Sequence, residues 1–450
     1  MSPPRKPKKP KQEQPEGITR ITVKGFKSLA EETSIEIRPL TILAGANSSG
    51  KSSIMQPLLL LKQTLEATYD PGPLKIDGPN VCFSQVREMF PRLLGQNLPR
   101  ELKVALQAGD GLAVTDVFRH GPGSGLELAE TAYRDSGRTL RLRPAMPYAE
   151  LARRVGQQMN RERTDLAKLF KRRLEWRVCA IRGFLTVGLA AAGARGAPPE
   201  PLVIRRLPEA VSQSVSESIH LPGLRGNPER TYKRTGTGPL FPGLFVEYPA
   251  SIISEWGETE DGRLQDLAGD LLRLGLTWKV RARPLTDTDL EVHVGRLARP
   301  GRGGSRDLVN IADVGFGVSQ VLPVLVALRA ASPGRLVYIE EPEIHLHPRA
   351  QVALASILAD AAKRGVRVVA ETHSDLLLLG VQTLVAQRDL SPSDVKLHWF
   401  KRDDRGVTRV LSADLDKAGT FGEWPEDFAD ERLKAQAQYL DAAEPRRWVS

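Results

Sequence analysis

The chain has 450 residues, 41% hydrophobic and 26% charged, proportions that are ordinary for a soluble folded protein, and this length favours two or three packed units over one core. No apolar run approaches the roughly 18 residues of a membrane span, and no apolar stretch follows the basic start, which argues against a secretory signal. We therefore expect a cytoplasmic protein without a membrane partner. The net charge of +10 leaves contact with DNA open, because basic surfaces bind polyanions.

The first hundred residues change character twice. Residues 1–17 are Pro-rich and basic without hydrophobic periodicity, which predicts a disordered arm. The stretches ITRITVKGFKSL and TSIEIRPLTILAG then read as strands, and the second runs directly into GANSSGKS, residues 45–52. SSIMQPLLLLKQTLEAT follows with apolar residues at helical spacing, which gives the order strand, loop, helix.

This loop matches the phosphate-binding pattern GxxxxGK[ST] at Gly45, Gly50, Lys51 and Ser52. Glycines allow successive backbone N–H groups to turn toward one anion, and the following helix directs its positive end there. Lys51 can reach the β- and γ-phosphates of ATP, and the Ser52 hydroxyl can bind Mg²⁺. The alternative is a glycine turn capped by serine. The other loop residues expected to contact the nucleotide are Ala46, Asn47, Ser48, Ser49 and Ser53. Residues 18–110 are thus predicted to form the N-terminal lobe of an ATPase.

The middle of the chain is Arg-rich and reads as helical. AELARRVGQQMNRERTDLAKLFKRRLEWRV carries the strongest helical pattern, and we predict a helical insertion over residues 111–215. A charged amphipathic helix pair without a binding role is the alternative. Residues 216–400 are predicted to form the C-terminal ATPase lobe, and residues 401–450 a small C-terminal extension.

Two short apolar runs in the second lobe end in polar residues. LVYIEEPE and VRVVAETHS have the form of buried parallel strands, and the helix RAQVALASILADAAKRG between them predicts a βαβ crossover stopped by Gly365. Glu340 and Glu341 end the first strand, where adjacent carboxylates are costly unless a cation or an ordered water needs them. We assign Glu340 to Mg²⁺ and Glu341 to the attacking water, with the reverse assignment open. An acidic strand end at the surface is the alternative.

Two further features can complete a phosphate site. His373 follows the second strand, from which a neutral imidazole can hydrogen-bond the γ-phosphate or the water; a capping or core histidine is the alternative. DVGFGVSQVLPVLVAL places a glycine turn at the start of an apolar helix, which makes a second anion-binding terminus or simply begins a core helix. A second such loop in one chain is explained if it meets the nucleotide of another subunit.

The ordered set GANSSGKS, GFGVSQ, LVYIEEPE, HLHP and ETHS resembles the ABC-type ATPases related to RecF, SMC and the OLD family, and most closely the single-chain ATPases of bacterial anti-phage systems. LPGLRGNPER and GEWPEDF resemble the subgroup with a short C-terminal domain of unknown function. The resemblance implies a nucleotide sandwich between two subunits, to which the second subunit contributes Gly315, Gly317 and Ser319. It also implies that Glu341 is the catalytic glutamate and His373 the switch histidine.

The sequence differs from the family at the signature motif, and its magnesium-sensing glutamine is not marked by a motif. The family's signature begins with serine where this chain has Gly315, so the γ-phosphate donor is open, with Ser319 as the substitute. Gln85 is placed only by analogy, as the glutamine that senses Mg²⁺. His345 to Pro348 resemble the family's loop near the dimer interface.

From these features we predict an α/β fold of the ABC-type P-loop NTPase class, with a mixed β-sheet core and a helical insertion. Its function is predicted to be ATP hydrolysis by Lys51, Glu341 and His373 in a homodimeric switch that controls an effector protein, such as a nuclease, in bacterial defence. A RecF-like or SMC-like DNA-binding ATPase, with basic helices near residues 150–177 on the duplex, is the first alternative. A scaffold that binds ATP but barely hydrolyses it is the second.

Overall fold

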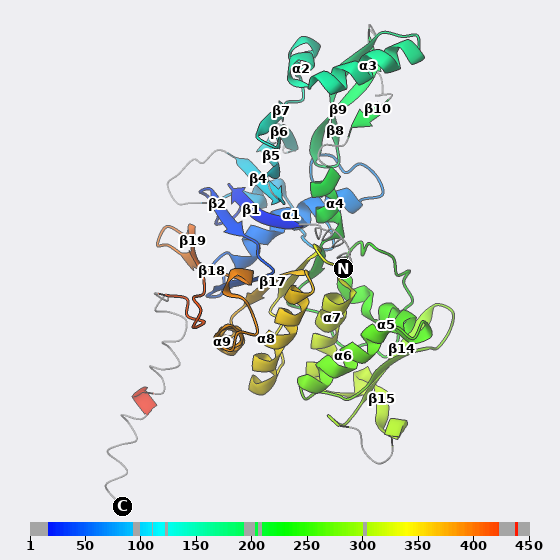
Figure 1. The fold of residues 1–450 in the computed structure, drawn as a ribbon, viewed down its shortest axis with the longest axis vertical. Helices are drawn as coiled ribbons and strands as arrows, with labels where there is room; N and C mark the ends of the chain where they lie inside the picture. The colour runs from blue at the N-terminus through cyan, green and yellow to red at the C-terminus, as the bar shows by residue number, and fades with distance from the viewer. Residues whose placement is uncertain are drawn as a thin grey trace, which may run out of the picture.

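A computed structural model describes residues 17–92, 100–109, 111–121, 125–192, 203–205, 209–299, 304–422 and 437–439. The expected disordered arm lies outside the described residues except for Gly17, and so does most of GEWPEDF. The described part of the chain is elongated, with helices α2 (Tyr148–Arg154) and α3 (Gln157–Leu169) at one end and the main helical layer toward the other (Figure 1). No helix within these described ranges combines the length and apolarity needed to cross a bilayer.

A six-stranded sheet forms the centre of the molecule. Its strands in spatial order are β11 (Ile219–Leu221), β16 (Leu336–Glu340), β17 (Arg367–Thr372), β3 (Leu40–Gly45), β18 (Val395–Arg402) and β19 (Thr408–Ala413). The first five run parallel and β19 runs antiparallel to β18. Continuous apolar runs suit strands that are covered on both faces, and every residue of β3 is buried. The expected α/β fold with a mixed sheet is confirmed.

Each face of the central sheet contacts a different hydrophobic core. Leu43 points into the core shared with α1 (Lys51–Glu66), whereas Ile42 points into the core shared with the helices of the opposite face. That opposite layer contains α7 (Phe316–Ala330), α8 (Pro348–Lys363) and α9 (Asp375–Ala386). Helix α8 connects the parallel strands β16 and β17, and Gly365 follows it with φ 88°, so the βαβ crossover is confirmed.

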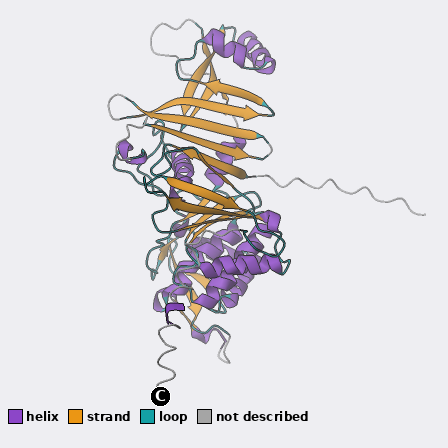
Figure 2. Cartoon of the chain, turned by 90° about the vertical axis from the view of Figure 1, so that its left-hand side faces the viewer, coloured by secondary structure: helices purple, strands orange, loops and turns teal. Residues whose placement is uncertain are grey.

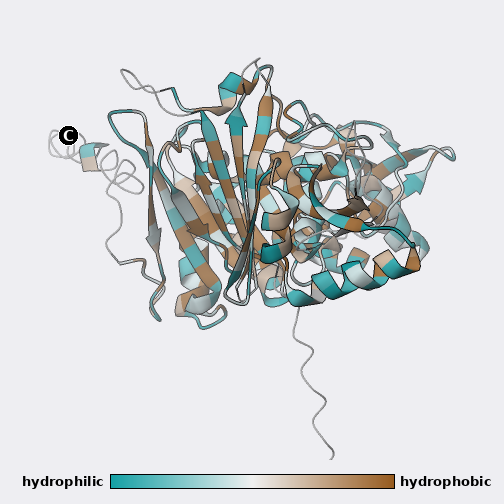
Figure 3. Cartoon of the chain, turned by 90° about the horizontal axis from the view of Figure 1, so that it is seen from above, coloured by the Kyte–Doolittle hydropathy of each residue, from teal (hydrophilic) through white to brown (hydrophobic). Residues whose placement is uncertain are grey.

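A second, wholly antiparallel sheet covers α1 on the side away from the central sheet (Figure 2). Its spatial order is β2 (Thr33–Glu36), β1 (Ile18–Lys24), β4 (Glu101–Ala108), β5 (Leu112–His120), β6 (Leu126–Asp135) and β7 (Arg138–Leu142). Brown and teal residues alternate along strands in the hydropathy view, as expected for sheets with one face on a core (Figure 3). Helix α4 (Glu209–Glu217) packs against α1 and this sheet.

Residues 111–215 are therefore not mainly helical, and this part of the sequence-based prediction is corrected. Among the described residues of this range the helices are α2, α3 and α4, and the other elements are β5, β6, β7, β8 (Leu174–Ile181), β9 (Phe184–Ala191) and β10 (Val203–Arg205). The arginines fall on the exposed positions of hairpin strands as well as on helices, so their abundance does not distinguish the two. The helical pattern ends at Leu169, and the LEWRV at its end lies in β8.

The remaining elements flank the helical layer. A small sheet contains β12 (Tyr232–Lys233), β13 (Val280–Pro284), β14 (Asp289–Gly295) and β15 (Leu308–Asn310), and α5 (Pro249–Glu258) and α6 (Gly262–Arg273) pack beside it. Short 3-10 turns occur at Val86–Met89, Phe245–Glu247, Gly304–Asp307, Ile311–Asp313 and Pro392–Asp394. The boundary expected at residue 400 falls inside β18, and β19 belongs to the central sheet, so residues 401–413 share the sheet of the predicted C-terminal lobe.

Candidate nucleotide-binding site

The loop between β3 and α1 has a backbone that requires its two motif glycines. Gly45 has φ 145° and Gly50 has φ 102°, conformations that L-residues rarely adopt. A Cβ on Gly45 would lie 2.2 Å from the Phe400 carbonyl oxygen, and one on Gly50 would lie 2.3 Å from Thr408 Oγ1. The loop is therefore pressed against β18 and β19 on one side, and Ala46, Asn47 and Ser48 are exposed on the other.

Lys51 and Ser52 begin α1 and point toward the end of the central sheet. Lys51 is 3% exposed, and its Nζ donates to the carbonyl oxygens of Gly45 and Ala46 at 3.0 and 2.9 Å. Burial lowers the pKa of Lys51, an effect that the Glu371 carboxylate opposes. The ammonium thus donates to two neutral carbonyl oxygens of the loop. Phosphate oxygens can take the place of these carbonyl oxygens and form stronger, charge-assisted hydrogen bonds with Lys51.

Glu371 was not predicted as a site residue from the sequence, yet it is in direct contact with the loop lysine and serine. Ser52 Oγ donates to Glu371 Oε1 at 3.0 Å, and Lys51 Nζ lies 3.9 Å from the same oxygen. The Tyr338 hydroxyl donates to Glu371 Oε2 at 2.7 Å. Burial raises the pKa of Glu371 to about 7, against the effect of these donors. Glu371 is the penultimate residue of β17, which lies between β3 and β16 in the sheet.

Glu340 contacts a different set of partners from those expected. Its Oε1 lies 3.1 Å from His220 Nε2, and its Oε2 accepts from the Gly223 N–H at 3.2 Å. Burial opposes ionisation of this carboxyl, yet the bonds from His220 and Gly223 leave its pKa below the usual range. Through the Tyr338 hydroxyl, Glu340 is next to Glu371 rather than isolated from the loop.

Glu341 and His373 form a second pair at the same sheet edge. Glu341 follows β16 in the left-handed region, with φ 45°, and its N–H donates to the Glu371 carbonyl oxygen at 2.7 Å. Its Oε1 lies 3.6 Å from His373 Nε2, and both side chains are partly exposed. Burial and the nearby Lys51 lower the pKa of His373, which favours the neutral imidazole at pH 7. The pair can accept a proton from a bound water.

Two buried residues that the sequence analysis overlooked support this pair. Glu343 Oε1 accepts from the Thr372 hydroxyl and from the His373 N–H, the latter at 3.1 Å. Arg225 donates to the carbonyl oxygens of both Glu340 and Glu341. Burial raises the pKa of Glu343 and lowers that of Arg225 to about 10. No local pattern marks Arg225, whereas Glu343 lies within the quoted EEPE motif.

The expected second anion site is at the start of α7. Gly315 is the N-cap, Gly317 lies in the first turn, and Ser319 Oγ donates to the Phe316 carbonyl oxygen at 3.1 Å. Helix α7 leads back into β16, so its N-terminus lies at the same sheet edge as the P-loop. It packs against α5, α6 and α8, on the face opposite α1. Phe316 is 50% exposed at this end.

Gln85 is exposed and precedes the 3-10 turn at Val86–Met89. Among the described residues, no hydrogen bond or ion pair joins its side chain to Ser52 or Glu340, and no group of three or more His, Cys, Asp or Glu side chains is arranged to hold a metal ion. Mg²⁺ needs only one or two protein ligands beside water and phosphate. The Ser52 hydroxyl and the adjoining Glu371 carboxylate are hard oxygen donors that fit this need.

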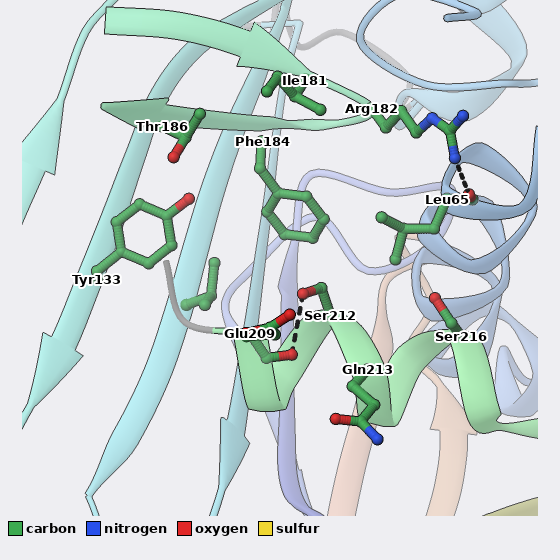
Figure 4. A pocket seen from close by; sticks show the side chains of 11 residues that line it. Leu65, Tyr133, Ile181, Arg182, Phe184, Thr186, Glu209, Ser212, Gln213 and Ser216 are labelled. Atoms are coloured by element: carbon green, nitrogen blue, oxygen red, sulfur yellow. Dashed lines mark hydrogen bonds between the residues drawn. The ribbon is translucent and has the colours of Figure 1, made fainter. Parts of the chain in front are cut away.

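Two cavities lie near these elements. One, of about 590 Å³, is bounded by the P-loop, His373 and the end of β18; its lining residues are Gly45, Ala46, Asn47, Ser48, Ser49, His373, Trp399, Phe400, Lys401 and Arg402. The other, of about 270 Å³, is lined by residues of α4, β6 and β9, among them Ser212, Tyr133 and Phe184, and Arg182 beside it donates to the Leu65 carbonyl oxygen (Figure 4). Only the first includes predicted site residues.

Comparison with known proteins gives two sequence matches. Residues 17–91 match a family described as "AAA ATPase domain", and residues 197–379 match one described as "AAA domain, putative AbiEii toxin, Type IV TA system". The first contains the P-loop, and the second contains α7, β16 and β17. None of the curated proteins matches the chain.

Heads of SMC proteins are among the solved structures that the chain is similar to. The SmcHead bound to the C-winged helix domain of ScpA is 13% identical, with 89% of this chain and 99% of that chain covered and a TM-score of 0.49. The Smc head domain with an extended coiled coil, bound to the C-terminal domain of ScpA derived from Pyrococcus furiosus, is 13% identical, with coverages of 94% and 99% and a TM-score of 0.47. The SMC head domain from Thermotoga maritima is 13% identical, with coverages of 88% and 98% and a TM-score of 0.36. At these TM-scores they add no weight to the assignment. The chain is therefore similar to AAA ATPase domains over these two ranges, and its glycine loop, lysine and acids at the carboxyl ends of parallel strands are those of a P-loop NTPase fold.

Proposed function

We propose that the protein binds and hydrolyses ATP with Mg²⁺, using the P-loop residues 45–53 to hold the phosphates. The single observation that supports this most is the convergence of Lys51, Ser52, Glu371 and the Glu341–His373 pair at one sheet edge. When bound, Mg²⁺ supplies positive charge to the phosphate oxygens, and Ser52 with Glu371 or Glu340 would hold it. Gln85 remains an analogy-based candidate for this ion.

In the proposed reaction Glu341 takes the proton of the attacking water. Its carboxylate is partly exposed and lies 3.6 Å from His373 Nε2, so it can accept a proton at this edge. The neutral imidazole of His373 can donate to the γ-phosphate or to the water. Lys51 exchanges its two carbonyl acceptors for phosphate oxygens, which stabilises the charge of the transition state.

We further propose that ATP closes a homodimer, in which the α7 N-terminus of one subunit meets the P-loop nucleotide of the other. Two observations support this: the α7 terminus points to the sheet edge beside the exposed Phe316, and it lies on the face opposite its own α1. Gly315, Gly317 and the α7 N-terminus would supply backbone N–H groups, with Ser319 as a hydroxyl donor. Opening after hydrolysis would gate an effector protein, such as a nuclease in bacterial defence.

A mixing experiment tests the composite site. Lys51→Ala removes the phosphate lysine, and Gly315→Asp places a negative charge at the α7 terminus, where an added Cβ meets nothing within 4 Å. Each variant alone should lose turnover. A mixture should regain part of it, because a heterodimer keeps one site with an intact loop and an intact α7. Turnover of the mixture equal to the sum of the two separate variants would reject the dimer.

DNA binding is the second candidate, and the charge of the α2–α3 end favours it. Residues 148–178 contain nine Lys or Arg against four Asp or Glu, a net +5 that is half of the chain's +10. Lys171, Arg172 and Arg173 are exposed next to the exposed Phe170 at the end of α3. Changing these three cations to Glu should weaken binding of a duplex and reduce the salt slope of log K by roughly 3. Absence of duplex binding by the unmodified protein at low salt would reject this candidate.

A further inference from the structure

The segment 219–226 connects two parts of the proposed site that are far apart in sequence. It begins as β11, which pairs in parallel with β16, with Ile219 opposite Val337 and Leu221 opposite Ile339. It then runs past the end of β16 and reaches the first turns of α7. One segment thereby contacts both the strand that delivers Glu341 and the helix that begins at Gly315.

Arg225 makes the contacts to both elements. Its Nη2 donates to the carbonyl oxygens of Glu340 and Glu341, the latter at 3.1 Å, and its Nη1 donates to the Gln320 carbonyl oxygen at 3.3 Å. Gln320 returns a bond from Nε2 to the Gly226 carbonyl oxygen at 2.6 Å. Arg225 is 8% exposed, so water does not easily replace these bonds.

The same segment also holds the Glu340 side chain. His220 lies 3.1 Å from Glu340 Oε1 and stacks on Tyr338 with the ring centroids 5.2 Å apart. Glu340 and Glu341 are therefore fixed from one side by residues of a single short segment. Glu341 has φ 45°, a conformation that a non-glycine residue keeps only where its surroundings impose it.

Like Lys51, Arg225 is a buried cation near the acids of this edge. Burial lowers its pKa, and the carboxylates of Glu343, Glu340 and Glu341 oppose that effect. A lysine at this position keeps the charge but has only one nitrogen, so it cannot reach three carbonyl oxygens on two elements with the fork geometry of arginine. The substitution Arg225→Lys therefore tests the hydrogen-bond geometry of Arg225 while the positive charge is kept.

We propose that Arg225 is a positioning residue that fixes the backbone of Glu341 and couples it to the first turns of α7, so that contact at the α7 terminus adjusts the catalytic carboxylate. This inference rests on the proposed ATP hydrolysis, and it assigns to the segment 219–226 a role that the P-loop and the βαβ motif do not provide. Arg225 acts through Glu341 and does not itself contact the nucleotide.

The test is a double-mutant cycle on kcat, with ATP affinity measured in parallel. Arg225→Lys should lower kcat by about 10- to 100-fold, because hydrogen bonds that place Glu341 are lost, and should leave the Kd for ATP unchanged. In the Glu341→Gln background the same substitution should lower kcat little further, since there is no carboxylate left to place. The matched control is Arg335→Lys, at the opposite end of β16, where an arginine that is also 8% exposed donates to the Pro239 carbonyl oxygen.

If Arg225→Lys fails to fold, Gln320→Met is the second test variant. This substitution removes only the Gln320 amide that donates to the carbonyl oxygen of the exposed Gly226. It should lower kcat in the same direction. Equal losses in both backgrounds, a raised Kd for ATP, or an equal effect of Arg335→Lys would overturn the positioning role while leaving the proposed function intact. A wild-type chain that binds ATP without turnover would overturn both.

Discussion

Acid should destabilise the central sheet through His398, a buried histidine in the strand that pairs with the P-loop strand. His398 lies opposite Leu43 in the β18–β3 pairing and is 1% exposed. Its Nε2 lies 2.9 Å from the Glu36 carbonyl oxygen, so Nε2 carries the proton, and Nδ1 lies 2.8 Å from Ser412 Oγ. The neutral imidazole thus has both of its bonding positions filled.

The size of this acid effect follows from the pKa of His398 in the folded and the unfolded chain. Burial lowers the pKa of His398 to about 4, against an ordinary value of 6.5 in the unfolded chain. Between these values the unfolded chain binds more protons, so the contribution to stability is complete above pH 6.5 and is lost as the pH falls through 4. Protonation of His398 therefore lowers the free energy of unfolding by about 3 kcal/mol between pH 7 and pH 4.

Urea unfolding at a series of pH values measures this effect against a His398→Gln variant. The free energy of unfolding of the wild type should fall by about 3 kcal/mol more than that of the variant between pH 7 and pH 4. Ser412→Ala is the matched control, because it removes a partner and retains the buried imidazole, so its acid-dependent loss should remain. Parallel curves for the wild type and His398→Gln would refute the reasoning.

Other substitutions test the loop itself. Gly45→Ala should lower the free energy of unfolding by about 3 kcal/mol or more in a urea titration, because its Cβ would lie 2.2 Å from the Phe400 carbonyl oxygen, whereas Gly156→Ala, with open space around it, should change little. Lys51→Ala should weaken ATP binding by about 100-fold in a calorimetric titration, since charge-assisted bonds to phosphate are lost. Ser52→Ala should raise the Mg²⁺ concentration required for turnover while the folded structure is retained; an unchanged requirement would count against a magnesium ligand there.

Local patterns in the sequence were sufficient for the P-loop and the βαβ crossover. The strand before Gly45 and the strands before Glu341 and His373 are continuous apolar runs, and such runs are buried wherever the chain places them. The same reasoning that selected Glu340 also applies to Glu371, an acid at the end of an equally buried strand.

Other site residues could not be predicted in this way because tertiary pairing creates their roles. His220 and Arg225 reach Glu340 and Glu341 only because β11 lies beside β16, a pairing between segments more than a hundred residues apart. The strands of the insertion were hidden for a related reason. A hairpin strand such as β7 carries exposed arginines, Arg138 and Arg141, and an Arg-rich helix also carries exposed arginines.

Hydrolysis of ATP by the Glu341 carboxylate is the central claim, and turnover of Glu341→Gln beside the wild type tests it most directly. The variant keeps the size of the side chain and leaves Lys51 and Ser52 intact, so ATP binding should be retained. Steady-state turnover should fall by about 100-fold or more, because a general base is lost. A wild type that hydrolyses ATP no faster than Glu341→Gln would contradict the account.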